Sequence, residues 1–343
     1  MGVKCYLLFQ KVKGHIFRAG EPVIGKLEYI IDKPTSFERI DIVFIGKGNC
    51  FWSESDSDDT RFYSNEEVYV SMFKNIRKDE TVQAGTYEHE FEFILPEDLP
   101  TSIKTVHCTI KYEVIAIFVK ANLFKSMKKF NVELPVTGYV KPYSPEQLVF
   151  NLKQEQSSEE INVKVEIEKT FVAPGEDIIL KVTINNDVDS PIKYIKTELI
   201  KQLTCVSDTR KTFTERGPVR NTKGYSRRLK PGTETIHRCV VPNTPNSCSI
   251  QHSKILIGEY KVRITAKYPL FHSDASVEIP VVIGEKREPH KVVIVRDGKP
   301  YSSTENSESG VNEDDFPIPM FFPCQRLYAC QISSKPIQPF LRD

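Results

Sequence analysis

Apolar and polar residues alternate along most of this chain. In many stretches an apolar side chain recurs at every second position, and the residues between are mostly Lys, Glu, Thr and Asp. Such alternation gives a strand one dry and one wet face, which is typical of an antiparallel sandwich. No long stretch carries a 3.6-residue period, so the pattern predicts an all-β protein with almost no helix. The clearest stretches cover 27–31, 40–44, 68–72, 87–95, 106–118, 130–136, 161–167, 178–184, 195–199, 260–268 and 277–283.

One segment of the sequence occurs twice. The segment Gly20-Glu21-Pro22-Val23-Ile24-Gly25-Lys26-Leu27 returns as Gly175-Glu176-Asp177-Ile178-Ile179-Leu180-Lys181-Val182, and each copy follows Phe-x-Ala. The spacing is much longer than the roughly 20–50 residues of a solenoid repeat. It matches the length of a whole domain. We therefore expect a sandwich domain over 1–140, a linker over 141–160, a second sandwich over 161–285 and a mostly disordered tail over 286–343. The linker is short, so the two domains should pack against each other.

Composition narrows the functional classes. The 343 residues carry a net charge of only +1. The protein therefore lacks the strong positive field that is typical of a nucleic-acid binder. The longest uninterrupted apolar run, 114–119, is far too short to cross a bilayer. Eight cysteines without regular spacing, and no Asn-x-Ser/Thr acceptor, favour a reduced, cytoplasmic protein. We expect no nucleic-acid partner.

Recognisable catalytic signatures are absent from the sequence. It contains no Gly-x-Ser-x-Gly, no Gly-rich phosphate loop with Lys and no His-Glu-x-x-His. The spacing of His237, Cys239, Cys248 and His252 fits no common zinc pattern, so these residues are interpreted as core thiols and loop histidines. We expect a protein that is not an enzyme and that has no cofactor and no metal.

Several motifs, taken together, resemble those of the arrestins, and within them the α-arrestin or arrestin-domain-containing branch. The resemblance covers about residues 6–284 and includes the Gly-Glu opening of both units. The other motifs are Gly46 with Trp52 and Glu54, Leu95-Pro96-x-x-Leu99-Pro100-Thr101-Ser102-Ile103, Ile110-Lys111-Tyr112-x-Val114-x-Ala116, Pro242-Asn243-Thr244-Pro245 and Tyr260-Lys261-Val262-x-Ile264. No single motif is specific to the arrestins, but the order of these motifs along the chain is.

The resemblance implies two tandem antiparallel, immunoglobulin-like β-sandwiches and an adaptor function. Such an adaptor would bind cytoplasmic segments of membrane proteins and couple them to ubiquitin-dependent endocytosis and protein transport. It would lie in the cytoplasm, peripherally at the plasma membrane and endosomes, with other arrestins as further partners. Related tails recruit HECT-type ubiquitin ligases through Pro-Pro-x-Tyr, which this sequence lacks. Its nearest fragments, Lys141-Pro142-Tyr143 and Lys299-Pro300-Tyr301, miss the first proline.

Candidate binding residues are basic or apolar. Paired Lys or Arg can hold phosphates or acidic peptides through charge-assisted hydrogen bonds. The candidates for cargo or phosphate are Lys11, Lys13, Arg227 and Arg228; those for an anionic membrane patch are Leu123, Phe124, Lys125, Lys128 and Lys129. In the tail, Phe316, Phe321 and Phe322 form a proline-spaced segment that is either a docking peptide or a strand placed on a sheet.

Two alternative functions remain at this point. One is a thiol-dependent regulator that binds a thioredoxin-type partner through Cys248, which follows a polar, Pro-rich hinge and is expected near the surface. The other is a retromer-like sorting subunit, which shares the two-sandwich body.

Overall fold

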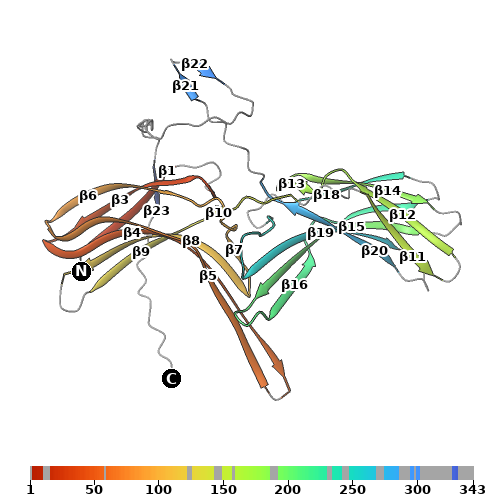
Figure 1. The fold of residues 1–343 in the computed structure, drawn as a ribbon, viewed down its shortest axis with the longest axis horizontal. Coiled ribbons are helices and arrows are strands. Elements are labelled where there is room, and N and C mark those ends of the chain that lie inside the picture. The colour runs from red at the N-terminus through yellow and green to blue at the C-terminus, as the bar shows by residue number, and fades with distance from the viewer. Residues whose placement is uncertain are drawn as a thin grey trace, which may run out of the picture.

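The computed structural model describes residues 2–10, 16–57, 59–121, 126–142, 149–156, 159–185, 192–229, 234–241, 247–267, 274–285, 294–296, 299–301 and 327–330. Every regular element in these ranges is a β-strand. The strands build two sandwiches placed end to end in an elongated body (Figure 1). The expected all-β fold with tandem sandwiches is thereby confirmed. In the described part of the chain, no helix has the length and apolar character to cross a membrane.

The first sandwich packs two antiparallel sheets. One sheet has the order β23-β1-β3-β6, and the other has the order β5-β4-β8-β7 with β9 beside β8. A parallel pair, β2 with β10, closes one end. The strands are β1 (Val3–Gln10), β2 (Phe17–Arg18), β3 (Pro22–Ile31), β4 (Thr35–Asp56), β5 (Asp59–Val82), β6 (Gly85–Ile94), β7 (Ile103–Lys104), β8 (Cys108–Lys120), β9 (Met127–Leu134) and β10 (Val136–Thr137).

The second sandwich also has two sheets. Their orders are β11-β12-β14-β18 and β13-β20-β19-β15-β16, with β17 paired to β15. Its strands are β11 (Val149–Gln156), β12 (Glu159–Ile167), β13 (Phe171–Val172), β14 (Asp177–Asn185), β15 (Ile192–Val206), β16 (Thr212–Pro218), β17 (Gly224–Leu229), β18 (Glu234–Val240), β19 (Leu256–Lys267) and β20 (Ala275–Ile283). Strand β11 lies inside the segment predicted as a linker. It pairs with β12 along its whole length, so this part of the segment belongs to the second sandwich.

Three short strands lie in the segment predicted as a disordered tail. Strands β21 (Ile294–Arg296) and β22 (Lys299–Tyr301) pair with each other. Strand β23 (Leu327–Cys330) returns to the first sandwich and pairs antiparallel with β1. The tail therefore contributes an edge strand to the first domain.

The repeated sequence segment forms the same structure twice. Gly20 and Gly175 both adopt a positive φ, 77° and 88°, a conformation that costs glycine little. The next amide closes the same turn in each copy: Glu21 donates to the Arg18 carbonyl and Glu176 to the Ala173 carbonyl, both at 3.1 Å. In both domains the preceding short strand, β2 or β13, pairs in parallel with a strand from the end of its domain. One local backbone solution thus opens both sandwiches.

Burial follows the predicted alternation. Strand β8 buries nearly every second side chain and lies between β4 and the strands β7 and β9. Its Tyr112 is fully buried, and its hydroxyl donates to the Pro100 carbonyl at 2.6 Å. This bond attaches the 95–103 motif to the core, because a buried hydroxyl needs a partner.

Candidate protein-interaction surfaces

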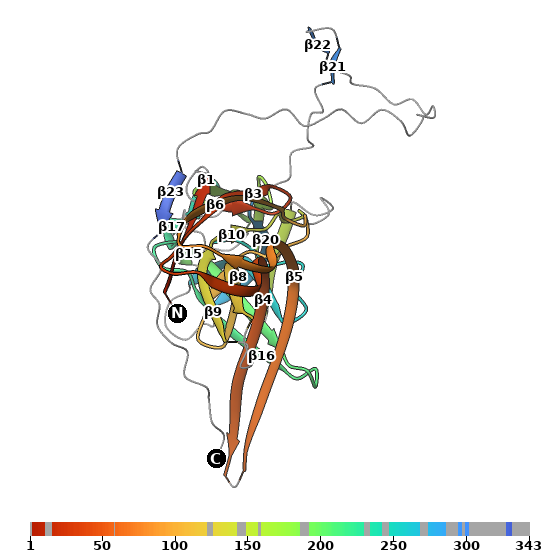
Figure 2. The ribbon, with the colours of Figure 1, turned by 90° about the vertical axis from the view of Figure 1, so that its left-hand side faces the viewer.

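The longest element of the structure is the β4–β5 hairpin. Strand β4 has 22 residues and β5 has 24, and their pairing runs from Thr35–Val82 to Asp56–Asp59 at the tip. A 22-residue strand spans about 70 Å at about 3.3 Å per residue. The distal half of the hairpin therefore projects well beyond the first sandwich (Figures 1 and 2). Its end is acidic and includes Glu54, Asp56 and Asp59.

The inner face of the projecting hairpin packs on the second domain. Trp52 stacks on Tyr63 with ring centroids 5.4 Å apart, and the ring of Phe213, from β16, lies 5.9 Å from Trp52. Trp52 is buried, although its indole Nε1 has no hydrogen-bond partner among the described residues. Its burial is therefore driven by ring packing.

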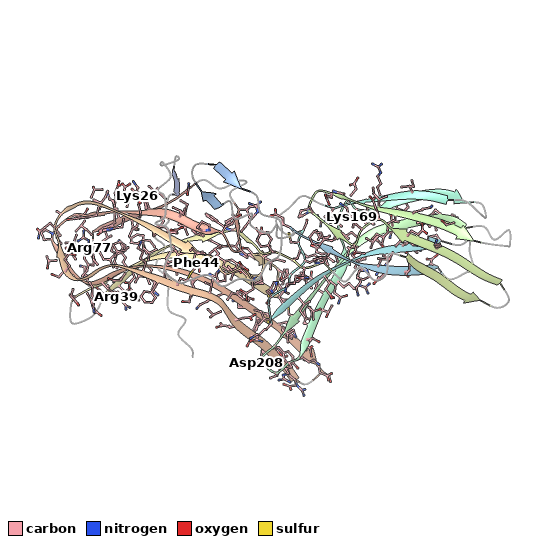
Figure 3. The ribbon with its side chains drawn as sticks, turned by 45° about the horizontal axis from the view of Figure 1, so that its top comes forward. Lys26, Arg39, Phe44, Arg77, Lys169 and Asp208 are labelled. Atoms are coloured by element: carbon pink, nitrogen blue, oxygen red, sulfur yellow. The ribbon has the colours of Figure 1, made fainter. Side chains whose placement is uncertain are left out.

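Hydrogen bonds join the hairpin to the end of β15 and to the loop that follows it. The Val206 carbonyl accepts hydrogen bonds from Asn65 Nδ2 at 3.1 Å and from Cys50 Sγ at 3.5 Å. The Asp208 amide donates to the Ser64 carbonyl at 3.0 Å, at the point where Figure 3 labels Asp208. Part of the β5 edge is consequently occupied by the second domain.

Further up the hairpin, side chains of β5 hold the segment before β19. The hydroxyls of Tyr69 and Ser253 are 2.9 Å apart, and Glu67 accepts from the Lys254 amide at 2.8 Å. Burial raises the pKa of Tyr69, the hydrogen bond with Ser253 opposes that shift, and the nearby Glu67 adds to it. The two domains thus meet along a continuous seam, and the expectation that they pack together is confirmed.

A second contact closes the seam near the repeated turns. Arg18 Nε donates to the Glu285 carboxylate at 2.7 Å, and this hydrogen bond raises the pKa of Arg18. The Val140 amide donates to the Glu285 carbonyl at 3.4 Å. The start of the first domain and the end of the second are held together there.

The outer face of the hairpin carries an exposed aromatic pair. The rings of Phe51 and Phe62 stack with centroids 6.0 Å apart, yet the residues are 56% and 68% exposed. We call these two residues, Phe51 and Phe62, the hairpin patch. Apolar side chains exposed together at a projecting element mark an interaction surface.

The outer edge of β1 accepts a strand. Lys128 Nζ donates to the Val3 carbonyl at 3.0 Å, whereas the Gly2 carbonyl accepts from Asp32 on the opposite side. Because strand backbone groups alternate in direction, Leu7 and Phe9 turn their amides and carbonyls to the same edge as Val3. Strand β23 pairs with β1 at that edge, in the register Leu7–Cys330 to Gln10–Leu327.

The structure describes only some of the candidate residues chosen from the sequence. Lys128 is half-buried and lies 5.2 Å from the centre of the Phe130 ring, whereas Lys129 is exposed on β9. Arg227 and Arg228 belong to β17, where Arg227 is opposite Tyr194. The remaining basic and apolar candidates lie outside the described residues: Lys11, Lys13, Leu123, Phe124, Lys125, Phe316, Phe321 and Phe322.

The expected surface position of Cys248 is wrong. Cys248 is only 4% exposed, and burial raises the pKa of its thiol to about 11. Strand β19 provides the neighbouring Tyr260, whose pKa the Cys248 thiol affects. A buried, protonated thiol is a poor nucleophile, so the rationale for a mixed disulfide at this residue is lost.

The hairpin patch was not found from the sequence, although a signal exists. Phe51-Trp52 and Phe62-Tyr63 place aromatic residues on both faces of their strands within a Ser- and acid-rich stretch. Consecutive aromatic residues break the period-two pattern, and the structure buries Trp52 and half-buries Tyr63. Their neighbours Phe51 and Phe62 are left exposed on the outer face.

The packing of Trp52 gives a prediction about stability. Trp52→Ala should lower the free energy of unfolding by about 3–5 kcal/mol, because it removes a buried indole from the seam. Trp52→Phe should cost much less, since the indole N–H makes no hydrogen bond among the described residues. Urea denaturation of both variants measures this, and equal losses for Ala and Phe would contradict it.

Comparisons with known proteins agree with this architecture. Residues 7–141 match the model of the arrestin (or S-antigen) N-terminal domain, and residues 157–288 match that of the C-terminal domain. Arrestin domain-containing protein 5 from Homo sapiens is 21% identical over 300 residues, covering 78% of this chain and 84% of that protein. The Bos taurus protein of the same name is 22% identical over 296 residues, covering 79% and 88%.

A more distant organism provides a further relative. Arrestin domain-containing protein B from Dictyostelium discoideum is 23% identical over 270 residues, covering 75% of this chain but only 42% of that longer protein. Both domain models, in the expected order, cover nearly all of the two sandwiches. The chain therefore belongs to the arrestin family, whose members are in general adaptors that bind other proteins rather than enzymes.

Proposed function

We propose that this protein is an adaptor that binds extended cytoplasmic segments of membrane proteins and couples them to endocytic sorting. The observation that carries the proposal is the antiparallel pairing of β23 with the outer edge of β1. A strand distant in sequence docks there through the backbone, so the edge is suited to other extended peptides. Strand addition supplies main-chain hydrogen bonds, and neighbouring side chains supply selectivity.

Basic residues near this edge favour acidic or phosphorylated peptides. Lys128 contacts the β1 backbone at Val3, and exposed Lys129 follows it on β9. In the sequence, Lys11 and Lys13 follow directly after β1. Charge-assisted hydrogen bonds are about twice as strong as neutral ones, so a phosphorylated segment would gain most at this position.

The hairpin patch supports a second contact with the same cargo or with the membrane that carries it. Phe51 and Phe62 are exposed and stack on each other at a projecting element. The acidic tip, which includes Glu54, Asp56 and Asp59, makes an anionic lipid surface a poor match. We therefore propose that the hairpin patch binds apolar residues of a cargo protein.

Coupling to ubiquitin would be indirect in this proposal. The sequence has no Pro-Pro-x-Tyr, the motif through which related tails recruit HECT-type ligases. A second arrestin or another partner would supply the ligase, and the adaptor itself would act on the cytoplasmic side of the plasma membrane and endosomes.

Charge reversal tests the basic part of the site. Lys11→Glu with Lys13→Glu should weaken binding of a phosphorylated cytoplasmic-tail peptide about tenfold, or by about 1.4 kcal/mol, without lowering the melting temperature. The matched control is Lys78→Glu with Lys104→Glu, which reverses two exposed lysines on the other sheet of the same domain. Unchanged affinity for every phosphorylated peptide tested would refute the assignment.

Release of the tail strand tests the acceptor edge itself. Tyr328→Pro should disrupt β23, because Tyr328 is opposite Phe9, whose backbone groups face β23, and proline cannot donate to a β-ladder. The variant should therefore increase the affinity of the same peptide several-fold. Tyr328→Val keeps the strand and serves as the control. Fluorescence anisotropy measures both affinities. If Tyr328→Pro leaves the affinity unchanged, peptides do not bind at the β1 edge.

Proximity labelling in cells tests the proposed function as a whole. The full chain and a version ending at residue 284 should both label membrane transporters or receptors, and labelling of ubiquitin ligases should depend on the tail. If membrane proteins are labelled but no ubiquitin ligase is, the function is restricted to sorting that does not involve ubiquitin. If neither chain enriches membrane proteins above a fold-matched control, the adaptor proposal is wrong.

A further inference from the structure

Three cysteines meet where the two domains join. Cys50 lies on β4, Cys108 on β8 and Cys205 near the end of β15. All three are buried, and all belong to one hydrophobic cluster that crosses from the first domain into the second. The other described cysteines, Cys5, Cys239 and Cys248, are buried elsewhere in the fold.

The β-sheet places Cys50 directly beside Cys108. The two residues are opposite each other in the β4–β8 register. The Phe51 amide donates to the His107 carbonyl at 2.8 Å, which makes Cys50 and Cys108 a non-hydrogen-bonded pair. The Cα atoms of such a pair are about 4.5 Å apart, and their side chains share one face.

Cys205 approaches Cys108 from the second domain. Cys205 is opposite Phe213 in the β15–β16 register, and the Phe213 ring lies 4.5 Å from the ring of His107, the neighbour of Cys108. The interaction between the two thiols raises the pKa of Cys108 and lowers that of Cys205. Cys50 is directed differently, because its Sγ donates to the Val206 carbonyl at 3.5 Å. Cys108 and Cys205 are therefore the pair of thiols that interact across the seam.

We propose that Cys108 and Cys205 form a reversible disulfide under oxidising conditions and thereby lock the two domains together. The bond would link β8 to β15 beside the Trp52–Phe213 contact, within the seam that holds the hairpin. Any movement that separates the domains would require the bond to be reduced. A metal ion is a poorer explanation, since no group of three or more His, Cys, Asp or Glu in the described ranges is arranged to hold one.

Hydrogen peroxide is a suitable oxidant because it is small, and because the pKa of Cys205, unlike that of Cys248, is lowered by its thiol partner. Cys205 loses its proton, and its sulfur attacks one peroxide oxygen. The O–O bond breaks, hydroxide leaves and takes up a proton as water, and Cys205 becomes a sulfenic acid. Cys108 sulfur then attacks the sulfenic sulfur, the S–O bond breaks, and hydroxide leaves with the Cys108 proton as a second water. Two thiols lose two electrons in total, and one peroxide becomes two waters.

Peptide mapping tests the proposal on the full chain. The reduced protein is exposed to hydrogen peroxide, blocked with N-ethylmaleimide and digested without reductant. We expect a linked peptide pair that contains Cys108 and Cys205, is two hydrogens lighter than its parts, and is lost after dithiothreitol. The oxidised protein should also melt at a higher temperature, and hydrogen exchange of residues 62–69 should slow.

Variants separate this bond from its neighbours. Cys108→Ala and Cys205→Ala should each abolish the linked pair and the peroxide-dependent rise in melting temperature. Cys50→Ala should keep both, as should Cys239→Ala, a buried cysteine in the core of the second domain. Circular dichroism of each variant confirms folding. Where an Ala variant does not fold, the Ser variant at the same cysteine replaces it.

Two results would overturn the proposal. One is the absence of the Cys108–Cys205 peptide at peroxide concentrations that oxidise methionine in the same sample. The other is a dominant Cys50–Cys108 peptide, which would place the disulfide within the first domain and leave the seam unlinked.

Discussion

The hydrophobic core that continues across the domain seam is the constraint on which the rest of the structure depends. The cluster that fills the first sandwich also includes Leu203, Cys205, Ile250, Ile255 and Leu256 from the second unit. Burial of apolar surface is the main favourable term in folding, so separating the two sandwiches would expose part of a core rather than a wet interface. The two domains are consequently coupled in stability as well as in position.

The β4–β5 hairpin shares this constraint. Its inner face contributes Trp52 and Tyr63 to the seam, and its Ser64 carbonyl accepts a hydrogen bond from Asp208, in the segment that follows β15. Its outer face is free of that packing and exposes Phe51 and Phe62. A partner that binds the outer face therefore contacts an element whose other side is part of the interdomain core. This arrangement gives a direct physical route from partner binding to the relation between the domains.

Edge strands are the other organising feature. An open edge presents unpaired amides and carbonyls and invites association with other chains. In this protein the second domain covers part of the β5 edge through Asp208, and the tail strand β23 covers part of the β1 edge. The β1 edge differs because its cover comes from a distant segment joined by a long connection.

Local signals in the sequence were sufficient for the architecture. Period-two alternation identified the strands because each residue's face depends only on its neighbours along the chain. The duplicated Gly-Glu segment identified two equivalent domains because Gly20 and Gly175 provide the same positive-φ turn. Together with the resemblance to arrestins, these signals predicted two tandem sandwiches and domains in contact.

Only the tertiary structure decided the features that depend on pairing between distant segments. The sequence indicated a surface thiol at Cys248, whereas β19 and its surroundings bury it. Nothing local distinguishes Phe51 from Trp52, since the outward or inward direction of each ring is set by the second domain on one side of the hairpin. The meeting of Cys108 with Cys205 likewise arises from the docking of two sandwiches. Periodicity along the chain thus determined what forms a strand, and nonlocal packing determined which surfaces remained exposed and which side chains met.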